Sequence, residues 1–165
     1  MKRFFTALLM ISLLLSGCGF FQERIMEPVT FHYLRSDYLY GKDSSVIVSE
    51  EREASGHRDD LSYLLALYLM GPVQKDSISP LPPGTRILKP EQHGNTVTLE
   101  LTNPSYTFQD TELTLACVCL TLTSLDITDA QEVVITYQDR TVSMTRESLT
   151  MMDNSVETFA SEETQ

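Results

Sequence analysis

Histidine and cysteine are the residue types in this 165-residue chain that could perform nucleophilic or metal chemistry, and there are three of each. A nucleophile at Cys117 or Cys119 would need a histidine base beside it, and His32, His57 and His93 are all distant in sequence. Both cysteines lie in an apolar segment, where burial raises a thiol pKa and blocks access. The chain has no Gly-x-Ser-x-Gly, His-Glu-x-x-His or glycine-rich phosphate motif. We therefore expect no enzymatic activity and two buried, inert thiols.

The spacing of potential ligands also predicts no metal and no cofactor. Cys117 and Cys119 are two residues apart, so they would point to opposite sides of a helix, or share a face of a strand but lie too far apart for comfortable disulfide geometry. No Cys-x-x-Cys or His-Cys cluster has zinc spacing. The adjacent carboxylates Asp59-Asp60 and Glu50-Glu51 diverge from each other, so we expect them on solvated surface. A calcium loop would need alternating oxygen ligands around a central glycine, and none is found.

The third cysteine has a different sequence context. Cys18 follows Leu15-Ser16-Gly17, and the segment before it carries Lys2 and Arg3 and then an apolar run. A basic start, a short apolar middle and small residues before a cleavage point are the parts of an export signal. Leu-Ser-Gly-Cys is similar to a bacterial lipobox, whose cysteine receives a diacylglycerol. The alternatives are an ordinary secretory signal, which would need no cysteine there, and a transmembrane anchor, for which the run is too short.

We accordingly predict a lipoprotein signal peptide at 1–17, lipidation at Cys18 and a tether at 18–28. This would place the protein on the outer face of the cell membrane. After the signal, ten basic and 23 acidic residues give a formal charge of −13. Such a charge repels phosphate backbones and anionic lipids, so we expect no nucleic-acid binding, and membrane attachment through the lipid alone. The acidity could also serve solubility only.

The segments after the tether alternate between strand and helix patterns. Residues 29–34 and 46–48 are typical of strands. Residues 61–69 carry one apolar stripe after Asp59 or Asp60, either of which could cap a helix that Gly71 and Pro72 end.

The second half of the chain is predicted to be rich in strands. Residues 85–88 and 96–101 bracket a glycine-containing turn and predict a hairpin, and 133–137 with 141–144 predict two further strands. The segment 112–125 fits a strand and a helix equally well. The polar, acidic segment 146–165 is expected to be a flexible tail.

Two of these segments carry motifs of a known family. The helix end at Gly71-Pro72 and the loop Leu81-Pro82-Pro83-Gly84-Thr85, with the hairpin and the last strand following in order, resemble the GerMN domain of sporulation and spore-germination lipoproteins. We regard these motif positions as structural, and the resemblance covers residues 29–144. It implies a domain at 29–145 of α+β class, with a small mixed or antiparallel sheet and two helices packed on one face, similar to ring-building modules. It also favours a helix for 112–125.

The chain departs from that family in two ways. It has room for one such domain instead of two, and residues 103–110 replace an aspartate- or serine-rich segment.

The resemblance implies a non-catalytic envelope protein that binds other proteins as a scaffold or assembly factor, with sporulation or germination as the candidate processes. Exposed sheet edges can pair with a second chain, so self-association is possible. The alternative is a module that binds cell-wall glycan or peptide through Tyr38, Tyr40, Tyr106 and Phe108, although the chain has no tryptophan. A degenerate hydrolase accessory domain is ranked last.

Overall fold

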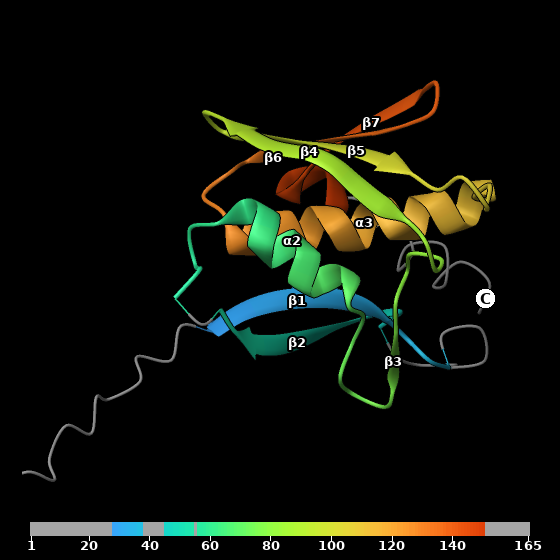
Figure 1. The fold of residues 1–165 in the computed structure, drawn as a ribbon, viewed down its shortest axis with the longest axis horizontal. Coiled ribbons are helices and arrows are strands. Elements are labelled where there is room, and N and C mark those ends of the chain that lie inside the picture. Colours follow the sequence, from blue (N-terminus) through green and yellow to red (C-terminus); the bar gives the residue numbers. More distant parts are fainter. Residues whose placement is uncertain (1–27, 38–44, 55, 151–165) are drawn as a thin grey trace, which may run out of the picture.

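The computed structural model describes residues 28–37, 45–54 and 56–150. The predicted signal peptide, Cys18, nearly all of the tether, Tyr38, Tyr40 and the segment 151–165 lie outside the described residues. Figure 1 shows three layers, in which two helices lie between two separate sheets. In chain order the elements are β1 (Pro28–Arg35), β2 (Ile47–Glu53), α2 (Leu61–Leu69), β3 (Ser77–Ile78), β4 (Arg86–His93), β5 (Thr96–Thr102), α3 (Asp110–Ile127), β6 (Glu132–Tyr137) and β7 (Arg140–Thr145).

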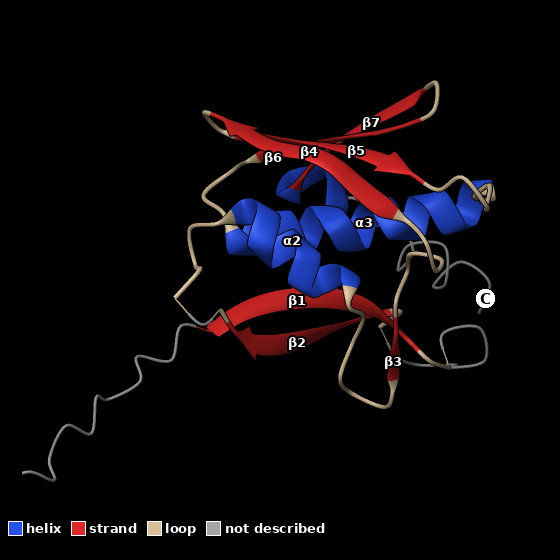
Figure 2. Cartoon of the chain, viewed as in Figure 1, coloured by secondary structure: helices blue, strands red, loops and turns tan. Residues whose placement is uncertain are grey.

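The predicted α+β class is confirmed, and the strands are divided between two sheets. One sheet has the order β2-β1-β3 and is antiparallel. The other has the order β4-β5-β6-β7, with a parallel pair between β5 and β6 that α3 connects. Helices cover one face of each sheet, so the second sheet closes the other side of the helical layer, whereas the resemblance implied one small sheet (Figure 2).

The helix over α3 is confirmed, and its surroundings explain the ambiguous sequence pattern. Ala116, Leu120, Thr121, Thr123 and Ser124 are all fully buried, although they cover different sides of the helix. α3 contacts β1 on one side and β6 and β7 on the other. Apart from Asp110, Thr111 and Thr114 near its start, α3 is buried or half-buried on every side, so its sequence lacks the polar face of an amphipathic helix.

The helix α2 ends and begins where the sequence predicted. The Asp60 side chain caps its N-terminus by accepting from the backbone N–H of Tyr63 at 2.9 Å. Leu64, Leu65 and Tyr68 are buried on one side. Gly71 has φ +83°, a left-handed conformation that glycine adopts without the steric cost of a Cβ atom, and the chain turns there.

The predicted strands of the second half are also confirmed. β4 and β5 pair antiparallel around the turn at Gly94, with a register shift between Leu88 and Glu91. The inward-facing Val97, Leu99 and Leu101 of β5 are buried.

The ordered structure extends beyond the expected domain boundary at 145. Residues 146–150 are helical, and Leu149 packs against the core. Among the described residues, neither long helix combines the length and apolarity needed to cross a bilayer.

Candidate functional site

A buried ion pair on β2 is the main polar feature beneath α2. The strand alternation turns Glu50 and Arg52 inward, on the same side as Val48, and Glu50 is 4% exposed. Arg52 Nε donates to Glu50 Oε1 at 2.5 Å. The Arg52 guanidinium also lies over the rings of Phe31 and Tyr33, at 5.6 and 5.8 Å from their centroids. The prediction that Glu50 lies on solvated surface was therefore wrong.

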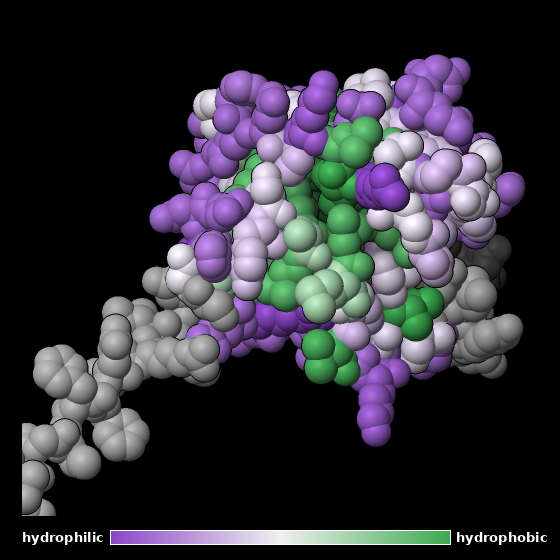
Figure 3. Space-filling model, viewed as in Figure 1, coloured by the Kyte–Doolittle hydropathy of each residue, from purple (hydrophilic) through white to green (hydrophobic). Residues whose placement is uncertain are grey.

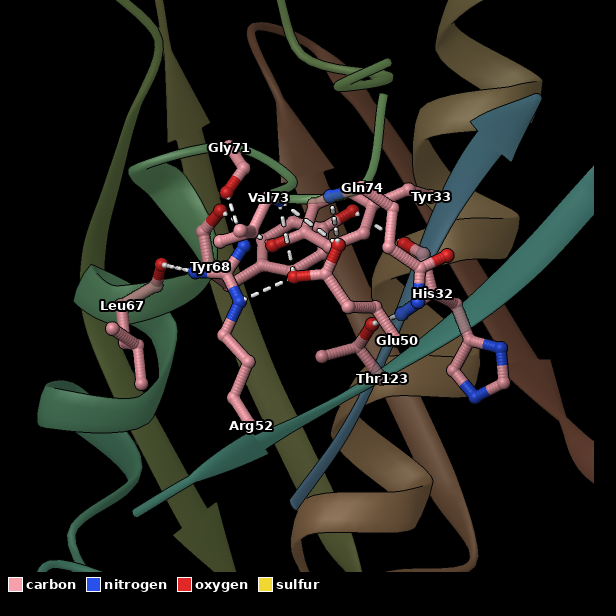
Figure 4. Close-up of polar contacts among 10 residues, drawn as sticks. All are labelled: His32, Tyr33, Glu50, Arg52, Leu67, Tyr68, Gly71, Val73, Gln74 and Thr123. Atoms are coloured by element: carbon pink, nitrogen blue, oxygen red, sulfur yellow. Dashed lines mark hydrogen bonds and ion pairs between the residues drawn. The ribbon is translucent and has the colours of Figure 1, made fainter. Parts of the chain in front are cut away.

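This ion pair fixes the loop that follows α2 (Figure 4). Arg52 donates through Nη1 to the carbonyl of Leu67 at 3.3 Å and through Nη2 to the carbonyl of Gly71. Glu50 accepts from the backbone N–H groups of Val73 and Gln74, each at 2.9 Å. A cation at the C-terminal end of a helix is favourable because of the helix dipole and the unpaired carbonyls there. The two side chains together hold the backbone of residues 71–74, which includes the predicted Gly71-Pro72 motif.

Hydrogen bonding keeps the Glu50 carboxylate charged in spite of its burial. Burial alone raises the pKa of Glu50, but the N–H groups of Gln74 and Val73 and the Arg52 guanidinium outweigh it and lower the pKa below its ordinary value. The site is therefore an ion pair at neutral pH.

Two stacked tyrosines support the same region from the core side. The rings of Tyr33 and Tyr68 are 4.8 Å apart and nearly parallel. Tyr33 Oη donates to the carbonyl of Tyr68 at 3.1 Å, and Tyr68 Oη donates to the carbonyl of His32 at 3.0 Å. These bonds tie the end of α2 to β1, so the loop rests on a rigid base.

Apolar side chains project from the fixed loop into solvent. Met70 is 79% exposed and Val73 is 78% exposed, and they flank Gly71-Pro72. Figure 3 shows apolar side chains gathering between the two sheets on the face that carries α2, with hydrophilic residues around them. We call Met70, Val73 and the loop between them the Met70–Val73 loop.

The second family motif is also fixed by a buried side chain. Asn103, 7% exposed, donates through Nδ2 to the carbonyl of Pro83 at 3.2 Å and to Thr85 Oγ1 at 3.0 Å. Thr85 Oγ1 in turn donates to the carbonyl of Pro82 at 2.7 Å, and Gly84 has φ +87°. The loop is thus held by a residue from the segment in which the sequence departs from the family pattern.

The six predicted motif positions therefore fall in two loops, each bound by polar side chains for which the sequence predicted no such role. Glu50 was assigned to the surface, and no role was predicted for Arg52 or Asn103. For the first two a signal existed, since Val48, Glu50 and Arg52 share one side of a strand and the two charges are opposite. Asn103 gave no comparable signal.

The cysteines and histidines form no catalytic group among the described residues. Cys117 and Cys119 are buried as predicted, and burial raises their pKa values to about 11 and about 12. His57 stacks on Tyr63, and His93 contacts the Glu91 carboxylate at 3.0 Å on the surface. No group of three or more His, Cys, Asp or Glu side chains within the described ranges could hold a metal ion.

The third histidine takes part in an ion-paired cluster. His32 Nε2 lies 2.7 Å from Asp126 Oδ2, and Arg146 Nη2 lies 2.6 Å from Asp126 Oδ1. Burial raises the pKa of Asp126, but the bonds from His32 and Arg146 outweigh it and lower the pKa below its ordinary value. These contacts join β1, α3 and the helical residues after β7.

Of the aromatic residues proposed for glycan binding, the structure describes Tyr106 and Phe108, and these two offer no shared exposed face. Phe108 is 2% exposed and belongs to the core, and its ring packs edge-on against Tyr137. Tyr106 is partly exposed, with its hydroxyl bonded to the Glu112 carboxylate at 2.8 Å.

Comparison with known proteins identifies one family. The family model named Germane, described as sporulation and spore germination, matches residues 34–143. This confirms the predicted resemblance. Comparison with curated proteins gives no significant match.

Two solved structures are similar to this chain. A candidate lipoprotein from Clostridium perfringens is 17% identical with a TM-score of 0.45, and the match covers 74% of this chain and 89% of that one. The tandem GerMN domains of the sporulation protein GerM from Bacillus subtilis are 18% identical with a TM-score of 0.47. That match covers 70% of this chain and 40% of the GerM chain.

Proposed function

Because the chain belongs to the Germane family of sporulation and spore-germination domains, we propose that it is a non-catalytic, lipid-anchored scaffold protein of the cell envelope. Its domain binds other envelope proteins and takes part in assembling a complex during sporulation or germination. Cys18 carries the lipid and holds the domain at the outer face of the membrane.

The proposed protein binding rests on one observation, the exposed apolar side chains of the Met70–Val73 loop. Its two apolar side chains are almost fully exposed, while Glu50 and Arg52 hold its backbone from below. Apolar surface that is already fixed in one conformation gains burial energy on binding with little loss of conformational entropy. A partner that presents a complementary apolar surface would therefore bind this loop.

Site-specific photo-crosslinking in intact cells tests this function. A photoreactive amino acid replaces Met70 in the full chain, and we expect it to capture one envelope protein. The capture should disappear when Val73→Asp is also present, because a charge in the contact must be desolvated. Val73 is exposed, so this change should leave thermal unfolding unaltered.

The same photoreactive residue at Thr98, exposed on the outer face of the other sheet, is the matched control and should not capture that protein. Capture that is equal at both positions, or that survives Val73→Asp, would show that the loop is not the contact. Capture of wall glycan or peptide instead of a protein would favour the alternative of wall binding.

A further inference from the structure

One exposed sheet edge, that of β7, lacks a neighbouring strand among the described residues and carries little charge. β7 pairs only with β6 among the described strands, and its other edge is free of strands in that part of the chain (Figure 1). Its residues 141–145 carry no charge. Unpaired strand edges are templates for association, and proteins normally blunt them with charges, proline, bulges or short length.

The other edges carry such protection. β4 is interrupted by a bulge, with Lys89 at φ 45° followed by Pro90, which has no N–H to donate. β2 ends in four consecutive charged residues, and β3 has only two residues. Among the described edge strands, β7 alone combines six residues with no proline, no bulge and a single charge, Arg140 at the turn.

The hairpin geometry determines which backbone groups of β7 face outward. Gln138, with φ 56°, and Asp139 form a two-residue turn that closes on the pair Tyr137 and Arg140. Such a turn closes on a hydrogen-bonded pair, so along the strand every second residue points its N–H and C=O away from the partner. The outward residues are Thr141, Ser143 and Thr145. Consistently, the N–H of Thr145 donates to Ser148 Oγ at 3.0 Å instead of to β6.

A small, mainly apolar cleft accompanies this edge, and the ion pair of Arg140 and Asp110 forms part of its lining. The cleft has a volume of about 180 Å³ between β7 and α3, and its lining includes Leu113, Cys117, Val142 and Met144. A strand added to β7 would direct alternate side chains toward this cleft. Backbone bonds supply affinity in such strand addition, and side-chain clefts supply selectivity.

We propose that β7 pairs with β7 of a second copy of this chain, antiparallel about a two-fold axis at Val142. This inference rests on the proposed assembly function. The outward backbone N–H and C=O groups of Thr141 would bond those of Ser143 in the second copy, and those of Ser143 would bond those of Thr141 in the second copy. The two Val142 side chains would face each other beside the clefts. Arg140 would lie opposite Met144, so no like charges would be paired across the axis.

Anchoring in one membrane would offset the electrostatic repulsion between two acidic copies of the chain. Two molecules with a formal charge of −13 repel each other in solution, and the contact is a short one. Lipid-anchored copies in one membrane plane have a raised effective concentration, which allows a weak contact to form. The pairing is therefore expected in the full, membrane-bound protein.

Disulfide trapping with Val142→Cys in the full chain tests this contact. Residues opposite each other in a non-hydrogen-bonded antiparallel pair have Cα atoms about 4.5 Å apart, within disulfide range. Membranes treated with a mild oxidant should yield a covalent dimer of twice the chain mass. The matched control, Leu88→Cys on the protected edge strand β4, should yield none.

Two charge variants in the Val142→Cys background test the register. Thr141→Lys with Ser143→Lys places lysine opposite lysine at both outward pairs and should reduce the dimer yield at least tenfold. Thr141→Glu with Ser143→Lys places opposite charges across the axis and should preserve the yield. Both positions are exposed, and thermal unfolding checks that each variant is folded.

Several outcomes would overturn the pairing. Absence of the dimer in a folded, membrane-bound Val142→Cys chain would do so, and so would trapping of a different protein, because the edge would then serve another partner. Equal yields from the two charge variants would refute the register. Capture from Met70 reports on the proposed scaffold function separately, so each can fail without the other.

Discussion

Glu50 and Arg52 show how a single pair of residues can shape a surface loop. Removing two charges from water is costly, and a buried ion pair often contributes little net stability against apolar replacements. Here the pair bonds four backbone groups, the carbonyls of Leu67 and Gly71 and the N–H groups of Val73 and Gln74. Its main effect is therefore to fix one conformation of the Met70–Val73 loop.

Substitution Glu50→Gln should destabilise the domain by about 3–5 kcal/mol, since it leaves the buried Arg52 cation without its counter-charge. It should also alter the pH dependence. The folded pKa of Glu50 is lowered, so its contribution is present above the unfolded pKa and is lost as the pH falls through the folded value. In denaturant titrations from pH 6 down to acidic pH, the wild type should therefore lose more unfolding free energy than Glu50→Gln.

Glu51 is the matched control for this experiment. It is the next residue on β2 and is exposed on the opposite side of the strand. Glu51→Gln should change the free energy of unfolding by less than about 0.5 kcal/mol. Equal losses for the two variants would mean that Glu50 is not the carboxylate that fixes the loop.

The same residues mark a limit of sequence-based prediction. The run from Glu50 to Glu53 has four charged residues, and charge alone favours a surface assignment. The strand period turns two of them inward, which requires knowing that β2 continues past Val48. The burial of Cys117 and Cys119 was easier to predict, because their neighbours in sequence are apolar.

At the scale of elements, the two helices differ in how far local sequence determines them. α2 has one exposed side, so its apolar stripe, its N-terminal cap at Asp60 and its end at Gly71 could all be predicted from the local sequence. α3 is buried from both sides, and the family resemblance was needed to predict it. The division of the strands into two sheets depends on which distant strands pair, and no local pattern carries that information.

Leu65→Asp tests whether the α2 stripe is part of the core. Leu65 is 1% exposed, and an unpaired carboxylate there would cost several kcal/mol, a large share of the roughly 5–15 kcal/mol that stabilises a domain. We expect the cooperative thermal transition, followed by circular dichroism, to be lost. Ala66→Asp on the exposed side of the same helix is the control and should melt as the wild type does. An unchanged transition in Leu65→Asp would place the stripe in solvent.

At the scale of the whole molecule, the proposed anchor and the charge of the chain act together. A formal charge of −13 after the signal gives the domain no electrostatic attraction to anionic lipids. Attachment would then depend on two acyl chains at one cysteine, which suffice for stable anchoring. The tether and anchor would leave the Met70–Val73 loop and the β7 edge free to meet neighbours in the membrane plane.

Cys18→Ala separates lipid anchoring from every other mode of attachment. The wild type should incorporate labelled fatty acid and stay with the membrane in high salt, because salt screens charges and leaves acyl insertion intact. Cys18→Ala should incorporate no label. The double variant Cys117→Ala with Cys119→Ala, which removes only the buried thiols, should be labelled as the wild type is. Label retained in Cys18→Ala, or release of the wild type by salt, would contradict a lipid at Cys18 and would remove the raised local concentration on which pairing through β7 depends.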